Sequence, residues 1–196
     1  LALARQNIDA FEAEDVDAII INSAGCGATL KEYKALMEHD PGYAEKAEKF
    51  SGKMRDISEF LAEIEMKPPQ GEIQRRVTYD EACHLVHGQQ IRLQPRQILQ
   101  SIPGLELVDL TESEWCCGSA GIYNITQPEM SRGILERKMK NIAETDAEIV
   151  ATGNPGCVLQ IQQGVQQHGL PMKVMHPIEL LDCAYRKVDP LGSTVR

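Results

Sequence analysis

The feature that most constrains the fold of this chain is an internal repeat. The stretch FEAEDVDAIIINSAGCG (11–27) aligns without a gap with IAETDAEIVATGNPGCV (142–158), so equivalent residues lie 131 positions apart and Cys26 matches Cys157. Each stretch reads as an acidic helix end, a short β-branched strand and a glycine turn that ends in cysteine. Further on, RDISEFLAEI (55–64) matches MHPIELLDCA (175–184) at an offset of 120. The repeat predicts two related α/β units in tandem.

The two copies differ in extent. The second contains Cys83 and the adjacent pair Cys116 and Cys117 upstream of Cys157, whereas counterparts in the first copy would fall before residue 1. We therefore expect the first unit to be truncated at its front and the chain, which starts with Leu1, to be a fragment or a processed form. The expected segments are the C-terminal half of the first repeat (1–66), a Pro/Gly linker (67–73), the complete second repeat (74–186) and a loosely ordered tail (187–196).

Short apolar runs alternate with segments of helical periodicity, which predicts an α/β fold with mainly parallel sheets flanked by helices. We expect strands at 18–21, 76–79, 105–109, 148–151 and 173–175. We expect helices at 1–11, 28–37, 43–50, 57–65, 93–101, 128–144, 158–168 and 177–186.

Composition excludes several classes of function. The formal net charge is −9 and no basic cluster occurs, so no nucleic-acid partner is expected. No apolar run approaches the roughly 20 residues of a transmembrane helix, and the N-terminal stretch lacks the pattern of a signal peptide. We expect a soluble, intracellular protein without a transmembrane segment.

The cysteines of the second copy share one local setting. Cys83, the Cys116–Cys117 pair and Cys157 each follow the end of an expected strand. Because the carboxyl ends of parallel strands meet at one edge of a sheet, the four thiols are expected to converge there. For both members of the adjacent pair to reach one centre the backbone must turn, and Gly118 supplies the freedom to do so.

Four thiolates suit an iron–sulfur cluster or zinc. The wide separations, 32 residues between Cys83 and Cys116 and 39 between Cys117 and Cys157, favour iron–sulfur, because structural zinc sites usually have close C-x2-C pairs. Disulfides and simple burial of the thiols stay open as alternatives. Cys26, as the counterpart of Cys157, is a further candidate metal ligand.

Four other residues, one cysteine and three histidines, have alternative interpretations. Cys183 lies in the amphipathic IELLDCAYR, where a core position is the favoured interpretation. His84 and His87 are candidates to supplement the ligand set, against helix-capping or surface roles. His176 takes the place of Asp56 in the first copy, and both precede an expected helix, so a shared N-cap role is expected.

The motifs EACHL, WCCGSAG and GNPGC resemble the cysteine-rich CCG domain of heterodisulfide reductase B-type subunits and their relatives. Within that group, CCGSAGIYNITQPEMS, TGNPGCVLQIQQG and HPIELLDCAYR are similar to iron–sulfur subunits of glycolate oxidases (glycolate dehydrogenases). In that family the fuller pattern ends in C-x2-C. This chain departs from it, with Asn154 three residues before Cys157 and Ser23 three before Cys26, which puts a five-cysteine, noncubane cluster in doubt.

The resemblance implies an electron-transfer subunit without catalytic residues of its own. It implies a cluster, 4Fe-4S for four cysteines, held by Cys83, Cys116, Cys117 and Cys157, with amides near Gly118, Gly121 and Gly156 donating to sulfur. Partner flavin subunits would oxidise glycolate, and electrons would pass to a membrane quinone or another acceptor. The implied location is the cytoplasm or the inner face of the cytoplasmic membrane. The alternatives are a subunit for lactate or glycerol-3-phosphate oxidation and a zinc-stabilised assembly scaffold.

Overall fold

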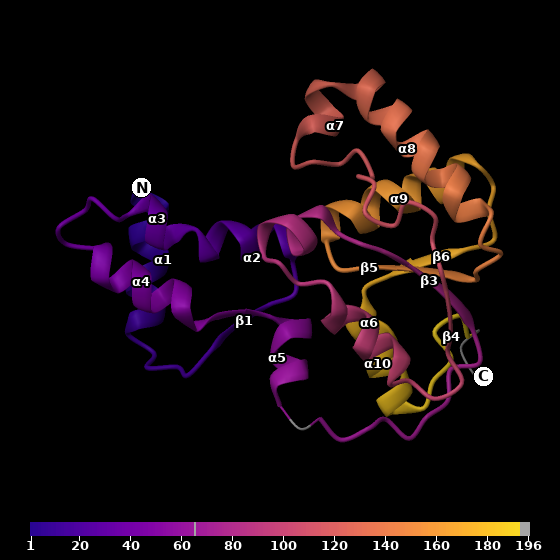
Figure 1. Ribbon diagram of the computed structural model, residues 1–196, viewed down its shortest axis with the longest axis horizontal. Helices are drawn as coiled ribbons and strands as arrows, with labels where there is room; N and C mark the ends of the chain where they lie inside the picture. Colours follow the sequence, from indigo (N-terminus) through magenta and orange to yellow (C-terminus); the bar gives the residue numbers. More distant parts are fainter. Residues whose placement is uncertain (65, 193–196) are drawn as a thin grey trace.

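A computed structural model describes residues 1–64 and 66–192 of the chain (Figure 1). Every strand pair in it is parallel, which confirms the predicted α/β class with parallel sheets. The first unit contributes a two-stranded sheet and the second a four-stranded one. The strand orders are β1 (Ile19–Ile21)–β2 (Met54–Asp56) and β4 (Glu106–Val108)–β3 (Arg76–Asp80)–β5 (Ile149–Thr152)–β6 (Lys173–Met175).

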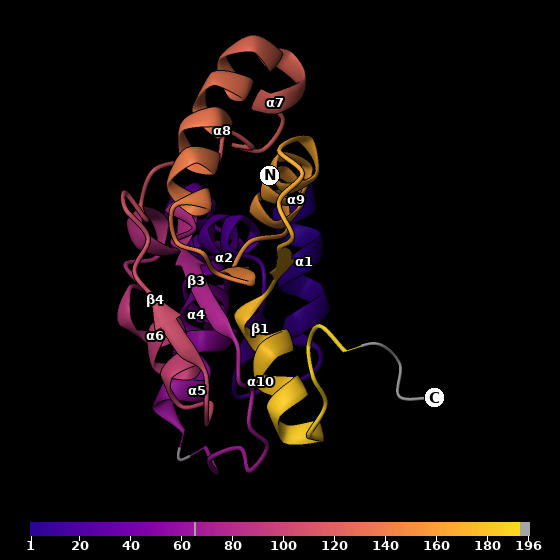
Figure 2. The same cartoon turned by 90° about the vertical axis from the view of Figure 1, so that its right-hand side faces the viewer.

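The larger sheet is buried on both faces. Val150 of β5 packs among side chains from α8 (Pro128–Ala143) and α9 (Pro155–Gln167). On the opposite face, Ile149 and Ala151 pack against the residues of α6 (Leu93–Gln100) and α10 (Pro177–Arg186). Figures 1 and 2 show the resulting three layers. Strands covered on both sides read as continuous apolar runs, which is why β5 has the sequence IVAT.

The first unit has its own small core. Ile8 of α1 (Ala2–Glu12), Phe50 of α4 (Ala44–Lys53) and Ile19 of β1 pack together with Tyr33 and Met37. Its other helices are α2 (Ala24–Lys31), α3 (Tyr33–Leu36) and α5 (Ile57–Glu63).

The repeat extends to the register of the strands. In the first unit Ile19 lies opposite Met54. In the second, Val150 lies opposite Val174. These residues correspond through the offsets of 131 and 120 found in the sequence, so β1–β2 and β5–β6 are equivalent ladders.

The repeat also preserves the ends of helices. Asp15 and Asp146, which are equivalent, both have positive φ, 44° and 50°. Asp56 and His176 are the N-caps of α5 and α10, and both form a capping box with the glutamate three residues on. The predicted N-cap role shared by these two residues is therefore confirmed.

The two units are joined at their equivalent turns. The backbone N–H of Ala24 donates to the carbonyl of Gly153 at 3.2 Å, and Gly25 N–H donates to Asn154 Oδ1 at 3.2 Å. Gln89 Nε2 donates to the Ala24 carbonyl at 2.9 Å. The turn that carries Cys26 is thereby held against the turn that carries Cys157.

Several elements differ from expectation. β2 is not among the expected strands, because its sequence MRD carries two charges in three residues. The expected helix 28–37 is two helices, α2 and α3, and α9 begins at Pro155 because proline suits the first turn. A π-helical turn, η1 (His84–Gly88), follows Cys83, and a short helix, α7 (Tyr123–Thr126), precedes α8.

Residues 67–73 contain no helix or strand, as a linker would. The expectation of a loosely ordered tail is wrong for 187–192. Asp189 pairs with Arg75, the Pro190 carbonyl accepts a hydrogen bond from Lys173, and Leu191 packs on the core. The end of the expected helix 57–65, at Glu65, and the tail residues 193–196 lie outside the described residues. Within the described ranges, no helix is both long and apolar enough to span a bilayer.

Candidate functional site

The candidate site lies at the carboxyl ends of three adjacent strands. In the order β4–β3–β5–β6, the chain leaves β3 toward β4 but leaves β5 toward β6, so the connections diverge between β3 and β5. Such a switch point opens a crevice at the carboxyl edge of the sheet. Cys83 follows β3, Cys116 and Cys117 follow β4, and Cys157 follows β5. The expected edge is therefore the one at which all four cysteines lie.

The four thiols contact one another in a chain. Cys83 neighbours Cys116, Cys116 neighbours Cys117, and Cys117 neighbours Cys157, and each pair is close enough for the two thiols to shift each other's pKa. Cys117 and Cys157 are buried, while Cys83 and Cys116 are partly exposed. All six cysteines of the chain are free thiols, so the site contains no disulfide.

The thiols have unequal acidity. Hydrogen bonds from Cys117 and Cys83, together with the Gly118 N–H, lower the pKa of the Cys116 thiol. Donation to Cys116 raises the pKa of the Cys83 and Cys117 thiols, and burial adds to both rises. The cluster thus favours one thiolate, on Cys116, supported by neighbouring S–H and N–H donors.

The suitability of the site for a metal group can be assessed from its donors. Within residues 1–64 and 66–192, no three or more His, Cys, Asp or Glu side chains are arranged to hold a metal ion. The donor set itself consists of four thiols from three separate loops, with amide donors aimed at sulfur. That set fits a cluster, which is larger than a single ion and accepts ligands from separated segments.

Gly118 makes the turn after the cysteine pair possible. Its φ is +88°, and its N–H donates to Cys116 Sγ at 3.3 Å. A Cβ at this position would lie 2.5 Å from the backbone oxygen of Ser131 on α8. Ser131 Oγ donates to the Gly118 carbonyl at 2.8 Å and accepts from Gln160 Nε2 at 3.0 Å. The turn is thereby fixed to both α8 and α9.

Cys157 lies in the first turn of α9. Asn154, the N-cap residue, directs its Nδ2 to Cys157 Sγ at 3.5 Å and also accepts from Gly25 of the first unit. A Cβ on Gly156 would lie 2.8 Å from Ser119 Oγ, so glycine lets the loop after the cysteine pair approach α9. Asn154 therefore contacts both the thiol of Cys157 and the neighbouring unit.

The remaining candidates lie in different surroundings. Nδ1 of His84 is 3.5 Å from Cys83 Sγ, whereas His87 is exposed and lies near Glu114. Cys183 packs against the core beneath α10, as expected of a core cysteine. Cys26 is exposed on α2, outside the chain of contacting thiols.

Cys26 and the thiol-bearing loops face the same cleft between the units. This cleft, about 960 Å³ in volume, is lined by residues of α1, α2 and α3 on one side and by the loops after β3, β4 and β5 on the other. Its lining includes Cys26, His84, Ser119, Gly121 and Gly156. The loops that carry the four thiols thus form one wall of the cleft, although the four cysteines themselves are not among its lining residues.

A buried ion pair that the sequence analysis missed lies beside the thiols. Lys138 and Asp80 have side chains 0% and 2% exposed, and Lys138 Nζ lies 2.8 Å from Asp80 Oδ1. Burial raises the pKa of the Asp80 carboxyl, and the charge of Lys138 opposes that rise. The available signal was the position of Lys138 in α8, where it falls at helical spacing with the buried Leu135 and Ile142.

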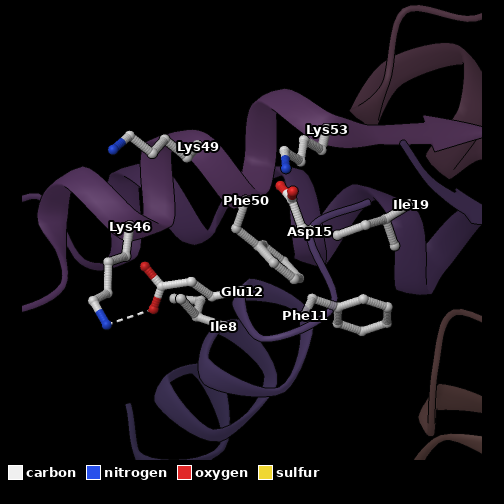
Figure 3. Close-up of a pocket in the computed structure, with 9 residues that line it drawn as sticks. All are labelled: Ile8, Phe11, Glu12, Asp15, Ile19, Lys46, Lys49, Phe50 and Lys53. Carbon is white, nitrogen blue, oxygen red and sulfur yellow. Dashed lines mark hydrogen bonds and ion pairs between the residues drawn. The ribbon is translucent and has the colours of Figure 1, made fainter. Parts of the chain in front are cut away.

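A second, smaller hollow lies in the first unit between α1, α4 and β1 and has a volume of about 190 Å³ (Figure 3). Phe50 forms part of its apolar wall, and Lys46 pairs with Glu12 at its rim at 2.5 Å. None of its lining residues is a cysteine or histidine, so it is separate from the thiol site. Its lining consists of Ile8, Phe11, Glu12, Asp15, Ile19, Lys46, Lys49, Phe50 and Lys53.

One family model matches the chain in two segments. The model of the CCG cysteine-rich domain matches residues 1–31 and 77–162, together more than half of the chain. The chain belongs to the CCG cysteine-rich domain family. The matched segments include Cys26 in the first unit and the four contacting thiols in the second, which confirms the family expected from the motifs.

Curated relatives come from oxidoreductase systems. A probable glycolate oxidase iron-sulfur subunit from Bacillus subtilis (strain 168) is 45% identical over 183 residues, 91% of this chain and 41% of that protein. A fumarate reductase (CoM/CoB) subunit from Methanothermobacter marburgensis is 41% identical over 88% of this chain and 33% of that protein. A lactate utilization protein A from Oceanobacillus iheyensis is 31% identical over 91% of this chain and 72% of that protein. The chain spans less than half the length of the first two.

Proposed function

We propose that this CCG chain is part of an iron–sulfur electron-transfer subunit of a flavin-dependent glycolate oxidase (dehydrogenase) complex. Cys83, Cys116, Cys117 and Cys157 would hold one 4Fe-4S cluster. Electrons would arrive from flavin-bearing partner subunits, which oxidise the 2-hydroxy acid, and leave toward a membrane quinone or another acceptor.

The observation that carries the proposal is the chain of contacts among four thiols from three strand ends. Cysteines 74 residues apart in the sequence, Cys83 and Cys157, belong to one partly buried cluster at the switch point of the sheet. Packing of small apolar side chains would not require free thiols at the ends of three strands. The name of the Bacillus subtilis relative, an iron-sulfur subunit, supports the same chemistry.

When bound, the cluster supplies one-electron transfer. The chain supplies the rest of the site. The Gly118 amide and the Asn154 side-chain amide donate to sulfur, which favours thiolates and the more negative, reduced form of the site. Burial of Cys117 and Cys157 limits access of water to these thiols, while Cys83 and Cys116 are partly exposed.

Four cysteines also bear on the type of cluster. Asn154 occupies the position at which the family pattern has a further cysteine, and its amide donates to Cys157 instead of adding a fifth thiolate. An ordinary 4Fe-4S cluster needs four thiolates, so we expect about four iron and four sulfide per chain.

Metal analysis of protein purified without oxygen, together with its partner subunits, tests the proposal. We expect iron and acid-labile sulfide in equal amounts and an electron paramagnetic resonance signal on reduction. Stoichiometric zinc without iron would overturn the electron-transfer role and would favour an assembly scaffold.

Matched cysteine variants test the assignment of ligands. Cys117→Ser removes the buried thiol that bridges Cys116 and Cys157, so we expect most of the iron to be lost and the second unit to be less stable. Cys183→Ser changes a partly buried thiol in the core beneath α10 and should retain the iron of the parent. Equal iron content in the two variants and the parent would contradict the assignment.

Lactate oxidation is the second candidate, because the lactate utilization protein A of Oceanobacillus iheyensis is matched over 72% of its length. The substrate would be decided by the flavin-bearing partner. Electron transfer to the chain's cluster should be measured in the assembled complex with glycolate and with lactate. Reduction of the cluster by lactate alone would replace glycolate by lactate in the proposed function.

A further inference from the structure

We propose that the buried pair Asp80 and Lys138 positions the three thiol-bearing segments and sets the reduction potential of the group that they hold. The second part rests on the proposed function, whereas the first can be tested without metal. Neither residue is a ligand, and each would act through the segments that it connects.

The pair belongs to a network that touches all three segments. Asp80 is the last residue of β3, three residues before Cys83. Its Oδ2 accepts from Thr152 Oγ1 at 2.9 Å, and Thr152 is the last residue of β5, the strand that leads to Cys157. The carboxylate therefore joins the ends of the two strands on either side of the switch point.

Lys138 connects this carboxylate to the third segment. Its Nζ donates to the carbonyls of Glu112 and Ser113 at 3.0 and 2.9 Å. These residues lie in the loop that leads into Cys116. The same ammonium group forms an ion pair with Asp80 Oδ1 at 2.8 Å. A single buried cation thus links the loop of the cysteine pair to β3 and, through Asp80, to β5.

A structural link alone does not require charge, since neutral side chains could fill the same space. A buried ion pair is often replaceable by apolar residues without loss of stability, whereas removal of one partner leaves an uncompensated buried charge. Asp80 lies three residues before Cys83, and Lys138 is bound to the loop that leads into Cys116, so both charges are buried beside the thiol site. The two charges therefore act on the thiol site with opposite signs.

The sign of each effect on reduction follows directly. Reduction adds an electron to the site, so a nearby positive charge raises the reduction potential and a negative charge lowers it. Lys138→Met leaves Asp80 unopposed, and the potential should fall. Asp80→Asn leaves Lys138 unopposed, and the potential should rise. The double variant, with neither charge, should return toward the parent value.

The decisive experiment is a redox titration, monitored by electron paramagnetic resonance, of the parent, the two single variants and the double variant within the assembled complex. Lys140→Met is the matched control, since Lys140 lies on the exposed face of the same helix. We expect shifts of opposite sign for Lys138→Met and Asp80→Asn and none for Lys140→Met. Shifts of the same sign, or none, would overturn the electrostatic part of the proposal.

Hydrogen exchange of reduced, metal-free protein tests the positioning separately. In Lys138→Met the amides of residues 111–118 should exchange faster than in the parent, because the loop loses both carbonyl contacts, while Lys140→Met should match the parent. Unchanged exchange would overturn the positioning role. If Lys138→Met does not fold, the double variant, with no unpaired charge, carries the same test. A parent that binds no iron would refute the proposed function, and this exchange comparison would still decide the positioning.

Discussion

Replacement of Gly118 by alanine tests whether the turn after the cysteine pair depends on glycine. The φ of Gly118 is +88°, a conformation that costs an L-residue about 1–3 kcal/mol. The new Cβ would also lie 2.5 Å from the backbone oxygen of Ser131, which belongs to α8 and cannot rotate away. Overpacking of this kind costs typically about 1–3 kcal/mol. Together the two effects predict a loss of at least about 2 kcal/mol in the free energy of unfolding.

Two other glycines separate these effects. Gly121 has φ +68° but open space around its Cβ position, so Gly121→Ala should cost only the backbone strain, about 1–2 kcal/mol. Gly133 lies within α8 and is also surrounded by open space, so Gly133→Ala should stabilise the protein by about 0.5–1 kcal/mol. The three variants carry the same chemical change, and only their surroundings differ.

Urea denaturation under reducing conditions measures the order of stability. Circular dichroism reports the whole chain, and fluorescence of Trp115, the single tryptophan, reports the segment next to Cys116. We expect Gly133→Ala to be the most stable, followed by the parent, Gly121→Ala and Gly118→Ala. If Gly118→Ala is no less stable than Gly121→Ala, the clash with α8 is absent. If Gly118→Ala unfolds at the same urea concentration as the parent, the reasoning about the turn is refuted.

Two further predictions concern the join between the units. Asn154→Ala removes the acceptor of the Gly25 N–H and a donor to Cys157. It should lower the free energy of unfolding, measured by urea denaturation, by about 1 kcal/mol. An unchanged urea midpoint would contradict the bridging role of Asn154. Burial lowers the pKa of His176, so the unfolded chain binds its proton more readily, and stability should fall as pH drops below about 6.5. His176→Asn retains an N-cap side chain and should flatten this part of the pH profile, and a profile identical to that of the parent would exclude His176 as its source.

The convergence of the thiols was predictable because it depends on topology. A cysteine at the end of each parallel strand needs only the common direction of the strands to reach a shared edge. The sequence contained that information in the repeat and in the placement of Cys83, Cys116 and Cys157 after β-branched runs. The same reasoning could not foresee which thiols would be buried and which partly exposed, since that depends on side-chain packing in loops.

The elements that sequence reasoning missed depend on contacts between distant segments. The strand β2 has the sequence MRD, which lacks the apolar pattern of a strand, and it forms because β1 offers a partner. The π-helical turn η1 depends on the burial of Leu85 and Val86 and on Gln89 reaching across to the first unit. Such turns occur frequently at functional sites, and this one begins directly after Cys83.

Lys138 shows a different limit of pattern reading. On the buried face of α8 a lysine interrupts an apolar stripe, and helical periodicity alone treats it as an exception. The charge of Lys138 is tolerated because Asp80, at the carboxyl end of β3, pairs with it and is held in turn by Thr152 of β5. This partner becomes apparent only in the folded structure.

The join between the units has a consequence for Cys26. The backbone contacts of Ala24 and Gly25 with Gly153 and Asn154 are made at equivalent turns, so the first turn of α2 and the first turn of α9 face a common cleft. Neither unit can shift along the other without breaking hydrogen bonds that involve the residues just before the two cysteines. These hydrogen bonds therefore help to set the position of Cys26 relative to the thiol site. A ligand that bridged the cleft would meet both cysteine-bearing turns in a defined geometry.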